Sequence, residues 1–141
     1  SGSMAEPVYR RFPYQFEGRC FSVSKGWLAL FEQVCQDVDQ ALGEDKRNFR
    51  WSDIKHKYGG LTMYFDMEAR GQDDPVVRAV QKIIFDASEL SETICEVCGE
   101  PGTVEVQGFW LDCLCPKHRA DRAALSTGEW RSIMKYERLY E

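Results

Sequence analysis

The chain has 141 residues, of which 29% are charged, and a formal net charge of -5 at pH 7. This length fits one domain whose core needs no disulfides, and no stretch approaches the roughly 20 apolar residues that span a bilayer. Residues 1–3 resemble a tag remnant before Met4 and no signal-peptide pattern follows, so we expect a single cytoplasmic domain at 4–141 with no membrane partner.

An amphipathic helix is predicted between Ser24 and Gly43. Ser24 is of a type that caps helix starts, and Gly43 is of the type that most often ends helices. Apolar residues recur between them at helical spacing, which places them on one buried face. They are Trp27, Leu28, Phe31, Val34, Cys35, Val38, Ala41 and Leu42.

A strand and a second helix are predicted after a polar, partly basic connection. Residues 61–67 alternate apolar and polar side chains, as in a half-buried strand, and Gly59-Gly60 marks its entrance. Asp74 is a natural helix cap and Pro75 suits the first helical position. This helix should run to about Ser91.

The last third predicts a hairpin and two short helices. Residues 103–106 and 109–112 are candidate strands around a turn near 107–108, and a helix could open within 116–125. A final short helix is predicted, with Ser126 or Thr127 as its cap. Its buried residues would be Trp130, Ile133, Met134 and Leu139. Together these elements predict an α+β fold, a small single domain with amphipathic helices and a short antiparallel sheet.

Two short motifs carry metal-binding residues. In Cys95-x-x-Cys98, two thiolates can reach one ion, and the following Gly99 permits the tight turn beneath it. Cys115-x-x-His118 supplies a second pair. Four such donors suit structural Zn²⁺ in tetrahedral geometry. We call the Cys95-x-x-Cys98-Gly99 turn the knuckle. The order of a knuckle, a hairpin and a ligand pair at a helix start is that of a treble-clef zinc finger at about residues 95–125.

The remaining cysteines leave one alternative open. Cys113 and Cys115 point to the same face of an extended strand, so either could be turned toward the ion. We prefer Cys115, because it forms a compact pair with His118. Cys20 and Cys35 are expected to be buried, as free cysteines usually are. In a reducing cytoplasm, this clustering is more typical of a metal site than of disulfides.

The predicted metal is structural. Four protein ligands close the coordination shell, whereas a catalytic zinc keeps a position open for water. The sequence contains no phosphate-binding loop, dinucleotide-binding glycine motif or nucleophile-elbow serine. His56 is expected at the surface or in a hydrogen bond rather than on the metal. We therefore predict no catalytic residues and a protein that is not an enzyme.

Charge is unevenly distributed along the chain. Basic and aromatic residues interleave over 46–58, as they can in a groove that binds a nucleic-acid strand. Residues 83–116 instead contain no lysine or arginine and should repel phosphate. Their carboxylates are Asp86, Glu89, Glu92, Glu96, Glu100, Glu105 and Asp112. A second basic region follows, with Arg119, Arg122, Arg131 and Lys135.

Three stretches carry a resemblance to known proteins: GWLALFEQVC, IKHKYGGLTMYF and CEVCGEPGTVEVQGFWLDCLCPKH. Together they resemble a group of small bacterial and phage-associated zinc-binding proteins. That group has a Gly-Trp helix, a Lys-x-x-Gly-Gly-Leu strand and a CxxCGxPG…LCxxH finger. The resemblance covers about residues 26–119. It implies a zinc-stabilised α+β domain with ligands Cys95, Cys98, Cys115 and His118, and it implies no activity.

Two functions are compatible with these observations. The first is a zinc-stabilised protein-binding module, specifically an immunity protein that neutralises a bacterial toxin domain by direct binding through an acidic face. The alternative is a nucleic-acid-associated regulator of phage or mobile-element origin. In that case Arg47, Arg50, Trp51 and Lys57 would hold the strand.

Overall fold

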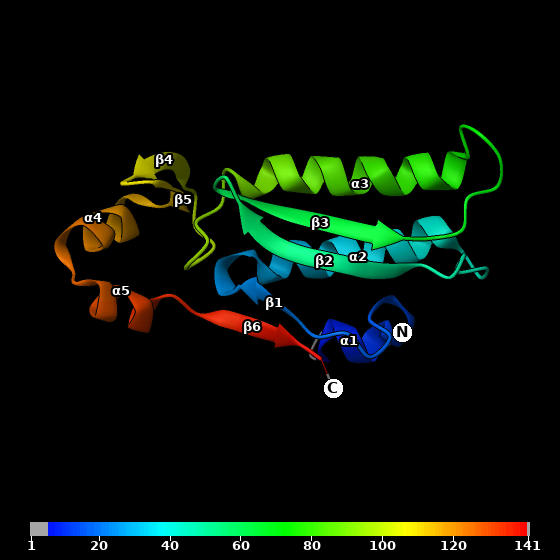
Figure 1. The fold of residues 1–141 in the computed structure, drawn as a ribbon, viewed down its shortest axis with the longest axis horizontal. Coiled ribbons are helices and arrows are strands. Elements are labelled where there is room, and N and C mark those ends of the chain that lie inside the picture. Colours follow the sequence, from blue (N-terminus) through cyan, green and yellow to red (C-terminus); the bar gives the residue numbers. More distant parts are fainter. Residues whose placement is uncertain (1–5, 141) are drawn as a thin grey trace.

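The computed structural model describes residues 6–140, so the predicted tag remnant at 1–3 lies outside the described residues. Figure 1 shows an elongated α+β molecule in which α2 and α3 run along the hairpin β2–β3, while β4, β5, α4 and α5 gather at one end. The helices are α1 (Val8–Arg11), α2 (Leu28–Leu42), α3 (Pro75–Ser91), α4 (Pro116–Ala124) and α5 (Thr127–Ile133). The strands are β1 (Phe21–Ser24), β2 (Arg50–Lys57), β3 (Gly60–Asp66), β4 (Thr103–Gln107), β5 (Trp110–Leu114) and β6 (Tyr136–Leu139).

The strands form three separate antiparallel pairs: β1 with β6, β2 with β3, and β4 with β5. The predicted strand at 61–67 is confirmed as β3, but the expectation that only a polar, partly basic connection precedes it is wrong for residues 50–57. These residues form β2, which buries Trp51 and Ile54. A register shift between Trp51 and Asp53 interrupts the alternation that would have identified the strand.

The two long helices begin and end close to their predicted boundaries. A 3-10 turn over Lys25–Trp27 precedes α2, so Ser24 makes no side-chain cap, while Gly43 ends the helix at φ 72°. At the start of α3, the carboxylate of Asp74 accepts a hydrogen bond from the backbone N–H of Val76. In the described part of the chain, no helix is long and apolar enough to cross a membrane.

The main core lies between the helices and the β2–β3 hairpin. Trp27, Phe31 and Trp51 are fully buried in it, and the last two rings pack with centroids 5.4 Å apart. The buried Gln15 accepts a hydrogen bond from Trp51 Nε1 and donates one to the carbonyl of Cys35, so its amide is satisfied.

The two remaining cysteine predictions have opposite outcomes. Cys35 is buried, as predicted. The prediction for Cys20 is wrong, because it precedes β1 and is exposed.

A smaller core holds together the end of the molecule that contains β4, β5, α4 and α5, and hydrogen bonds to two backbone carbonyls join it to the main body. Its buried members are Cys95, Leu114, Cys115 and Trp130. Gly26 N–H donates to the Glu96 carbonyl at 2.9 Å, and Trp27 Nε1 donates to the Ile94 carbonyl at 2.8 Å. After α5 the chain returns as β6 to pair with β1 (Figure 1), so Leu139 lies on a strand and not on the predicted last helix.

Candidate metal centre

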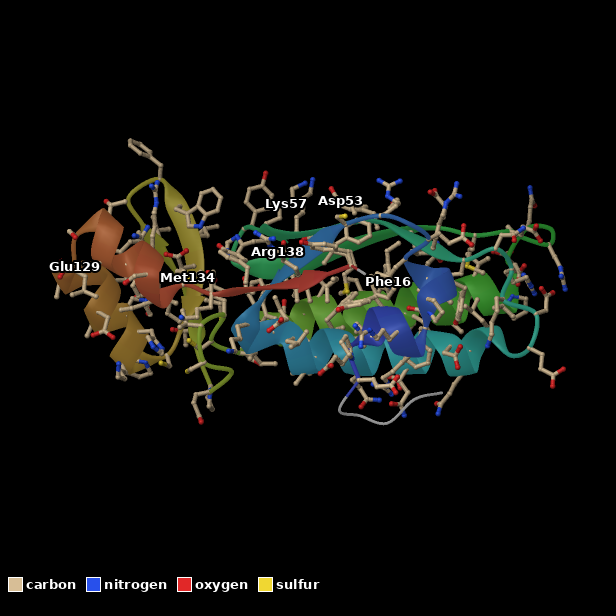
Figure 2. The ribbon with its side chains drawn as sticks, turned by 90° about the horizontal axis from the view of Figure 1, so that it is seen from below. Phe16, Asp53, Lys57, Glu129, Met134 and Arg138 are labelled. Carbon is tan, nitrogen blue, oxygen red and sulfur yellow. The ribbon has the colours of Figure 1, made fainter. Side chains whose placement is uncertain are left out.

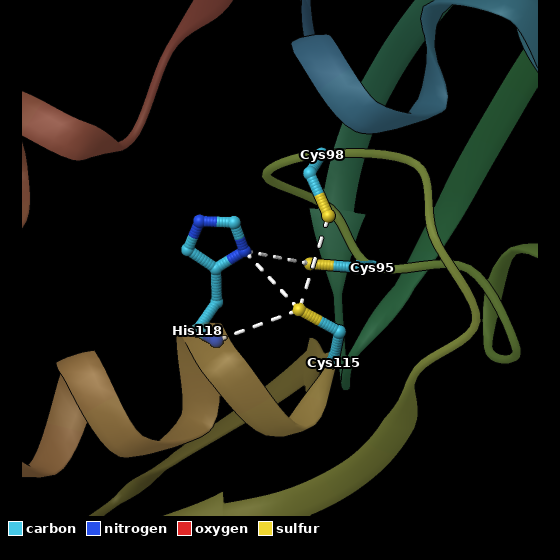
Figure 3. Close-up of side chains that lie close together, drawn as sticks. All are labelled: Cys95, Cys98, Cys115 and His118. Atoms are coloured by element: carbon cyan, nitrogen blue, oxygen red, sulfur yellow. Dashed lines mark hydrogen bonds between the residues drawn. The ribbon is translucent and has the colours of Figure 1, made fainter.

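The structure brings the four predicted ligands to one point. Cys95 and Cys98 lie on the turn that follows α3, while Cys115 caps α4 and His118 lies on its first turn. Figure 3 shows the three sulfur atoms and the imidazole converging on a common centre. Their ligand atoms all lie within 4.8 Å of one another.

Local backbone geometry produces the first half of this centre. Gly99 N–H donates to the Cys95 carbonyl at 2.9 Å, and Cys95 N–H donates to the Glu100 carbonyl at 2.7 Å. Gly99 has φ 82°, a value that glycine adopts without strain. The glycine therefore allows the tight turn that points both thiols inward, as the sequence predicts.

The distances between donor atoms suit a tetrahedral ion. Two sulfurs bound to one zinc at about 2.3 Å lie roughly 3.8 Å apart, and a bound sulfur and nitrogen lie roughly 3.6 Å apart. Cys98 Sγ and Cys115 Sγ are 3.8 Å apart, and Cys95 Sγ lies 3.6 Å from His118 Nδ1. The 3.2 Å from Cys115 Sγ to His118 Nδ1 is somewhat shorter. Three thiols and one imidazole at these spacings could hold a metal ion.

The thiols have unequal acidities. Burial opposes ionisation of Cys115, but the hydrogen bond from His118 N–H and the neighbouring thiols outweigh it and lower its pKa. Desolvation, with a further contribution from Cys95, raises the pKa of Cys98 to about 11. A divalent cation at the centre would favour the thiolate form of every cysteine that binds it.

Cys113 lies outside this group of ligands. Its side chain is fully buried in the main core, and desolvation together with the charge of Glu96 raises its pKa to about 12. On the other side of the centre, the ring of Trp130 on α5 packs edge-on to His118 at 6.5 Å between centroids. The structure thus places Cys115, and not Cys113, beside the histidine.

A second group of metal-ligating side chains was missed by the sequence analysis. His56 on β2, Glu96 on the knuckle and Asp112 on β5 place their ligand atoms within 4.8 Å of one another. The expectation of a hydrogen-bonded His56 is confirmed, since its Nε2 lies 2.9 Å from Glu96 Oε2. No local signal could have revealed the group, because its members come from three distant segments.

Electrostatics couples the three side chains. Desolvation alone would lower the pKa of His56, but the hydrogen bond and charge of Glu96 raise it overall. Desolvation, and then the charge of Glu96, raise the pKa of Asp112. Two buried carboxylates therefore share a small region with only partial compensation.

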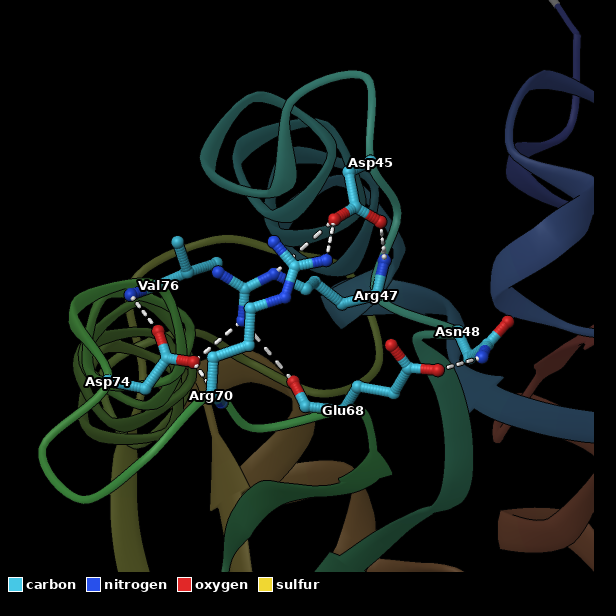
Figure 4. A network of polar contacts seen from close by, with 7 residues as sticks. All are labelled: Asp45, Arg47, Asn48, Glu68, Arg70, Asp74 and Val76. Carbon is cyan, nitrogen blue, oxygen red and sulfur yellow. Dashed lines mark hydrogen bonds and ion pairs between the residues drawn. The ribbon is translucent and has the colours of Figure 1, made fainter.

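Two of the residues predicted to hold nucleic acid are in the interior. Arg47 is buried, and its guanidinium lies 2.6 Å from Asp74 Oδ2, within the polar network drawn in Figure 4. Trp51 is fully buried. The prediction for these two residues is wrong, because Arg47 is buried against its ion-pair partner Asp74 and Trp51 is buried in the core. Arg50 and Lys57 are exposed.

The predicted acidic face is only partly on the surface. Glu96 and Asp112 are buried. The exposed members are Asp86, Glu89, Glu92, Glu100 and Glu105.

Comparisons with protein-family models, curated proteins and solved structures found no match for this chain. The resemblance to small bacterial and phage-associated proteins therefore stays a prediction. The function has to be argued from the residues and their arrangement.

Proposed function

We propose that the Cys95, Cys98, Cys115 and His118 centre binds structural Zn²⁺ and that the surrounding segment is a treble-clef finger. The donor set and the 3.8 Å and 3.6 Å separations support zinc. The order of knuckle, β4–β5 hairpin and ligands at the start of α4 supports the treble clef. Four protein ligands complete the shell, so the ion contributes stability rather than a site for chemistry.

We further propose that the protein is a binding module for another protein. The observation that carries this proposal is an exposed aromatic surface at the finger end, here called the knob, formed by Tyr58, Val106, Phe109 and Trp110. All four side chains are exposed, Phe109 completely. Aromatic side chains are enriched at the energetic centres of protein interfaces, and a cluster of them in solvent marks an interaction site.

Two parts of the knob, Trp110 and the turn that carries Tyr58, are held in place by contacts with the rest of the molecule. Trp110 stacks on His56 with ring centroids 5.4 Å apart, and His56 stacks in turn on the buried Trp27 at 5.4 Å. Gly59, beside Tyr58, approaches β4 so closely that an added Cβ would lie 2.6 Å from Val104. A preorganised surface loses little conformational entropy on binding.

Carboxylates exposed on the finger and at the end of α3 favour a basic partner, while one cation, Lys57, lies over Tyr58 of the knob. Glu100 and Glu105 are exposed on the finger, and Glu92 is exposed just after α3. Complementary charge speeds association and disfavours wrong partners. We propose that the partner is a basic bacterial toxin domain, which the protein neutralises as an immunity protein by covering its active site in the cytoplasm.

The test is binding to, and protection against, any toxin domain encoded next to this gene. The wild-type protein should form a stoichiometric complex and restore growth when the two are co-expressed. Phe109→Ala should weaken binding by at least about 30-fold, the effect of removing a central aromatic contact. Phe85→Ala is the matched control, because Phe85 is also an exposed phenylalanine but lies on α3. No complex, or equal loss in both variants, would refute the proposal.

Nucleic-acid binding is the second candidate. It rests on two exposed pairs of the β2–β3 hairpin, in which the ammonium of Lys55 lies over Tyr64 and that of Lys57 over Tyr58. This function would be favoured if the wild-type protein bound single-stranded DNA at low salt, if Lys57→Glu lost that binding, and if no toxin complex formed.

A further inference from the structure

A cleft of ≈ 560 Å³ lies between the finger and the start of β6, the strand that follows α5. Met134, labelled in Figure 2, forms part of its wall. His56, Glu96 and Asp112 also line it, with Arg122 and Arg131 beside them. The cleft thus joins the second group of metal-ligating side chains to solvent.

Both carboxylates are buried, and each keeps one oxygen uncommitted. Glu96 and Asp112 are 2% and 4% exposed. Both hydrogen bonds to Glu96, from the backbone N–H of Cys113 and with His56, fall on Oε2. Arg122 Nε contacts Oδ2 of Asp112 at 3.3 Å. Among the described residues, no hydrogen bond reaches Glu96 Oε1 or Asp112 Oδ1.

The three side chains are held in place before any ligand arrives. The ring of His56 is stacked between Trp27 and Trp110, with centroids 5.4 Å from each. Glu96 is anchored by the 3.0 Å bond from Cys113 N–H. A site whose ligands are already oriented spends little free energy on ordering them.

The local charge favours a cation. Two guanidinium groups line the cleft, but among the described residues only that of Arg122 pairs with one of these carboxylates, and it is also drawn over the ring of Trp130 at 5.5 Å. An ion placed between the carboxylates would relieve their repulsion.

We propose that His56, Glu96 and Asp112 form a second divalent-cation site, distinct from the finger and open to the cleft. One imidazole and two carboxylates are ligands of Zn²⁺ and Mn²⁺. Donors at about 2.0–2.2 Å from one ion lie roughly 3.0–3.5 Å apart, and the 2.9 Å between His56 Nε2 and Glu96 Oε2 is close to this range. Three protein ligands leave coordination positions for solvent.

The site binds more weakly than the finger. Before His56 can bind a metal through Nε2, it must give up the proton that it shares with Glu96. This proton either leaves to solvent or moves to Nδ1. Nδ1 is buried and has no hydrogen-bond partner among the described residues. Ligating histidines almost always donate from their second nitrogen, and loss of that partner typically lowers metal affinity 10–100-fold.

The experiment is a titration of the metal-free full-length chain with Zn²⁺ by calorimetry, with metal per chain counted after dialysis. A parallel Co²⁺ titration separates the sites, because only the finger gives intense thiolate-to-cobalt absorption. The wild-type protein should show a tight first phase with this absorption and a weaker second phase without it. His56→Gln and Asp112→Asn should each weaken the second phase by about 100-fold or more and leave the first unchanged.

Asp66→Asn is the matched control, because Asp66 is an exposed carboxylate on the neighbouring strand β3. It should bind as the wild type does. A wild-type titration that ends after one ion would overturn the proposal, as would a second phase that survives in both site variants. If His56→Gln also disturbs the finger, Asp112→Asn alone decides between these outcomes.

Discussion

Cys98 shows how a single residue can matter without being buried. Its side chain lies on an exposed turn, yet its sulfur is 3.8 Å from that of Cys115 within the candidate metal centre. The energy of a structural metal site is folding energy, because the unfolded chain holds no preformed site. The loss of one exposed thiol should therefore affect the whole finger.

Replacing Cys98 with serine should release the metal and lower stability by at least about 2 kcal/mol, or roughly 6 °C in Tm. Metal content after dialysis and thermal unfolding measure the two effects. Cys20→Ser is the control, since Cys20 is also exposed but is not a member of the cluster, and it should change stability by less than about 0.5 kcal/mol. Retained metal with unchanged melting in Cys98→Ser would contradict the assignment.

At this scale, what the sequence predicts depends on how local the signal is. Cys95 and Cys98, like Cys115 and His118, are three residues apart, so each half-site is visible as a motif. The bond between His56 and Glu96 spans 40 positions and exists only after folding. Spacing also cannot decide whether an aromatic such as Trp51 is a binding platform or part of the core.

Among the elements, α3 is the one whose start carries the most polar contacts. Its cap, Asp74, accepts bonds from the N–H groups of Val76 and Arg70, and it pairs with Arg47 (Figure 4). The hydrogen bond from Arg47, followed by that from the Arg70 N–H, holds the pKa of Asp74 far below its usual range. The helix start thereby anchors the loop that connects α2 to β2.

This carboxylate should make stability depend on acid. Its folded pKa lies below the unfolded value of about 3.9, so its contribution is complete above that pH and is lost as pH falls through the folded value. Asp74→Asn should be less stable than wild type at pH 7, and the difference should narrow below about pH 4. Urea midpoints at pH 7, 4 and 3 measure it.

Comparing the two proteins at each pH removes the effect of metal loss in acid, which both share. Asp73→Asn is the matched control, because Asp73 is exposed and its positive φ suits asparagine equally well. A wild-type advantage that stayed constant down to pH 3 would exclude this role for Asp74.

The elements differ in how far the sequence predicts them. The periodic apolar residues of α2 and α3, with Gly43 and Asp74 at their ends, identify both helices. The sequence does not predict a strand over residues 50–57, because the register shift after Trp51 breaks the alternation of buried and exposed side chains. The pairing of β1 with β6 has no local signal, since strands this short depend on their partner.

At the scale of the whole molecule, stability depends on the close packing at the junction between the body and the finger. Gly26 packs so closely against the knuckle that an added Cβ would lie 2.1 Å from the Cys95 carbonyl oxygen and 2.6 Å from the Glu96 carbonyl carbon. Both neighbours are backbone atoms that cannot turn aside. The lack of a side chain at this one position allows the two parts to meet.

Gly26→Ala should therefore destabilise the protein by about 1–3 kcal/mol, as backbone is forced apart and the bond from Gly26 N–H to the Glu96 carbonyl weakens. Gly128→Ala should have the opposite sign, a gain of about 0.4–1 kcal/mol, because Gly128 lies in α5 with open space around it. Chemical unfolding of both variants tests the contrast. Equal effects would show that the junction is not tightly packed.

The β1–β6 pair also sets an order of events during synthesis. β1 is made early, but its partner β6 follows the whole body and finger. At ribosomal speeds of about 5–20 residues per second, β1 waits on the order of ten seconds for β6. Until then β1, which carries the buried residues Phe21 and Val23, lacks its partner strand. The unpaired edge is open to aggregation and to chaperones during synthesis.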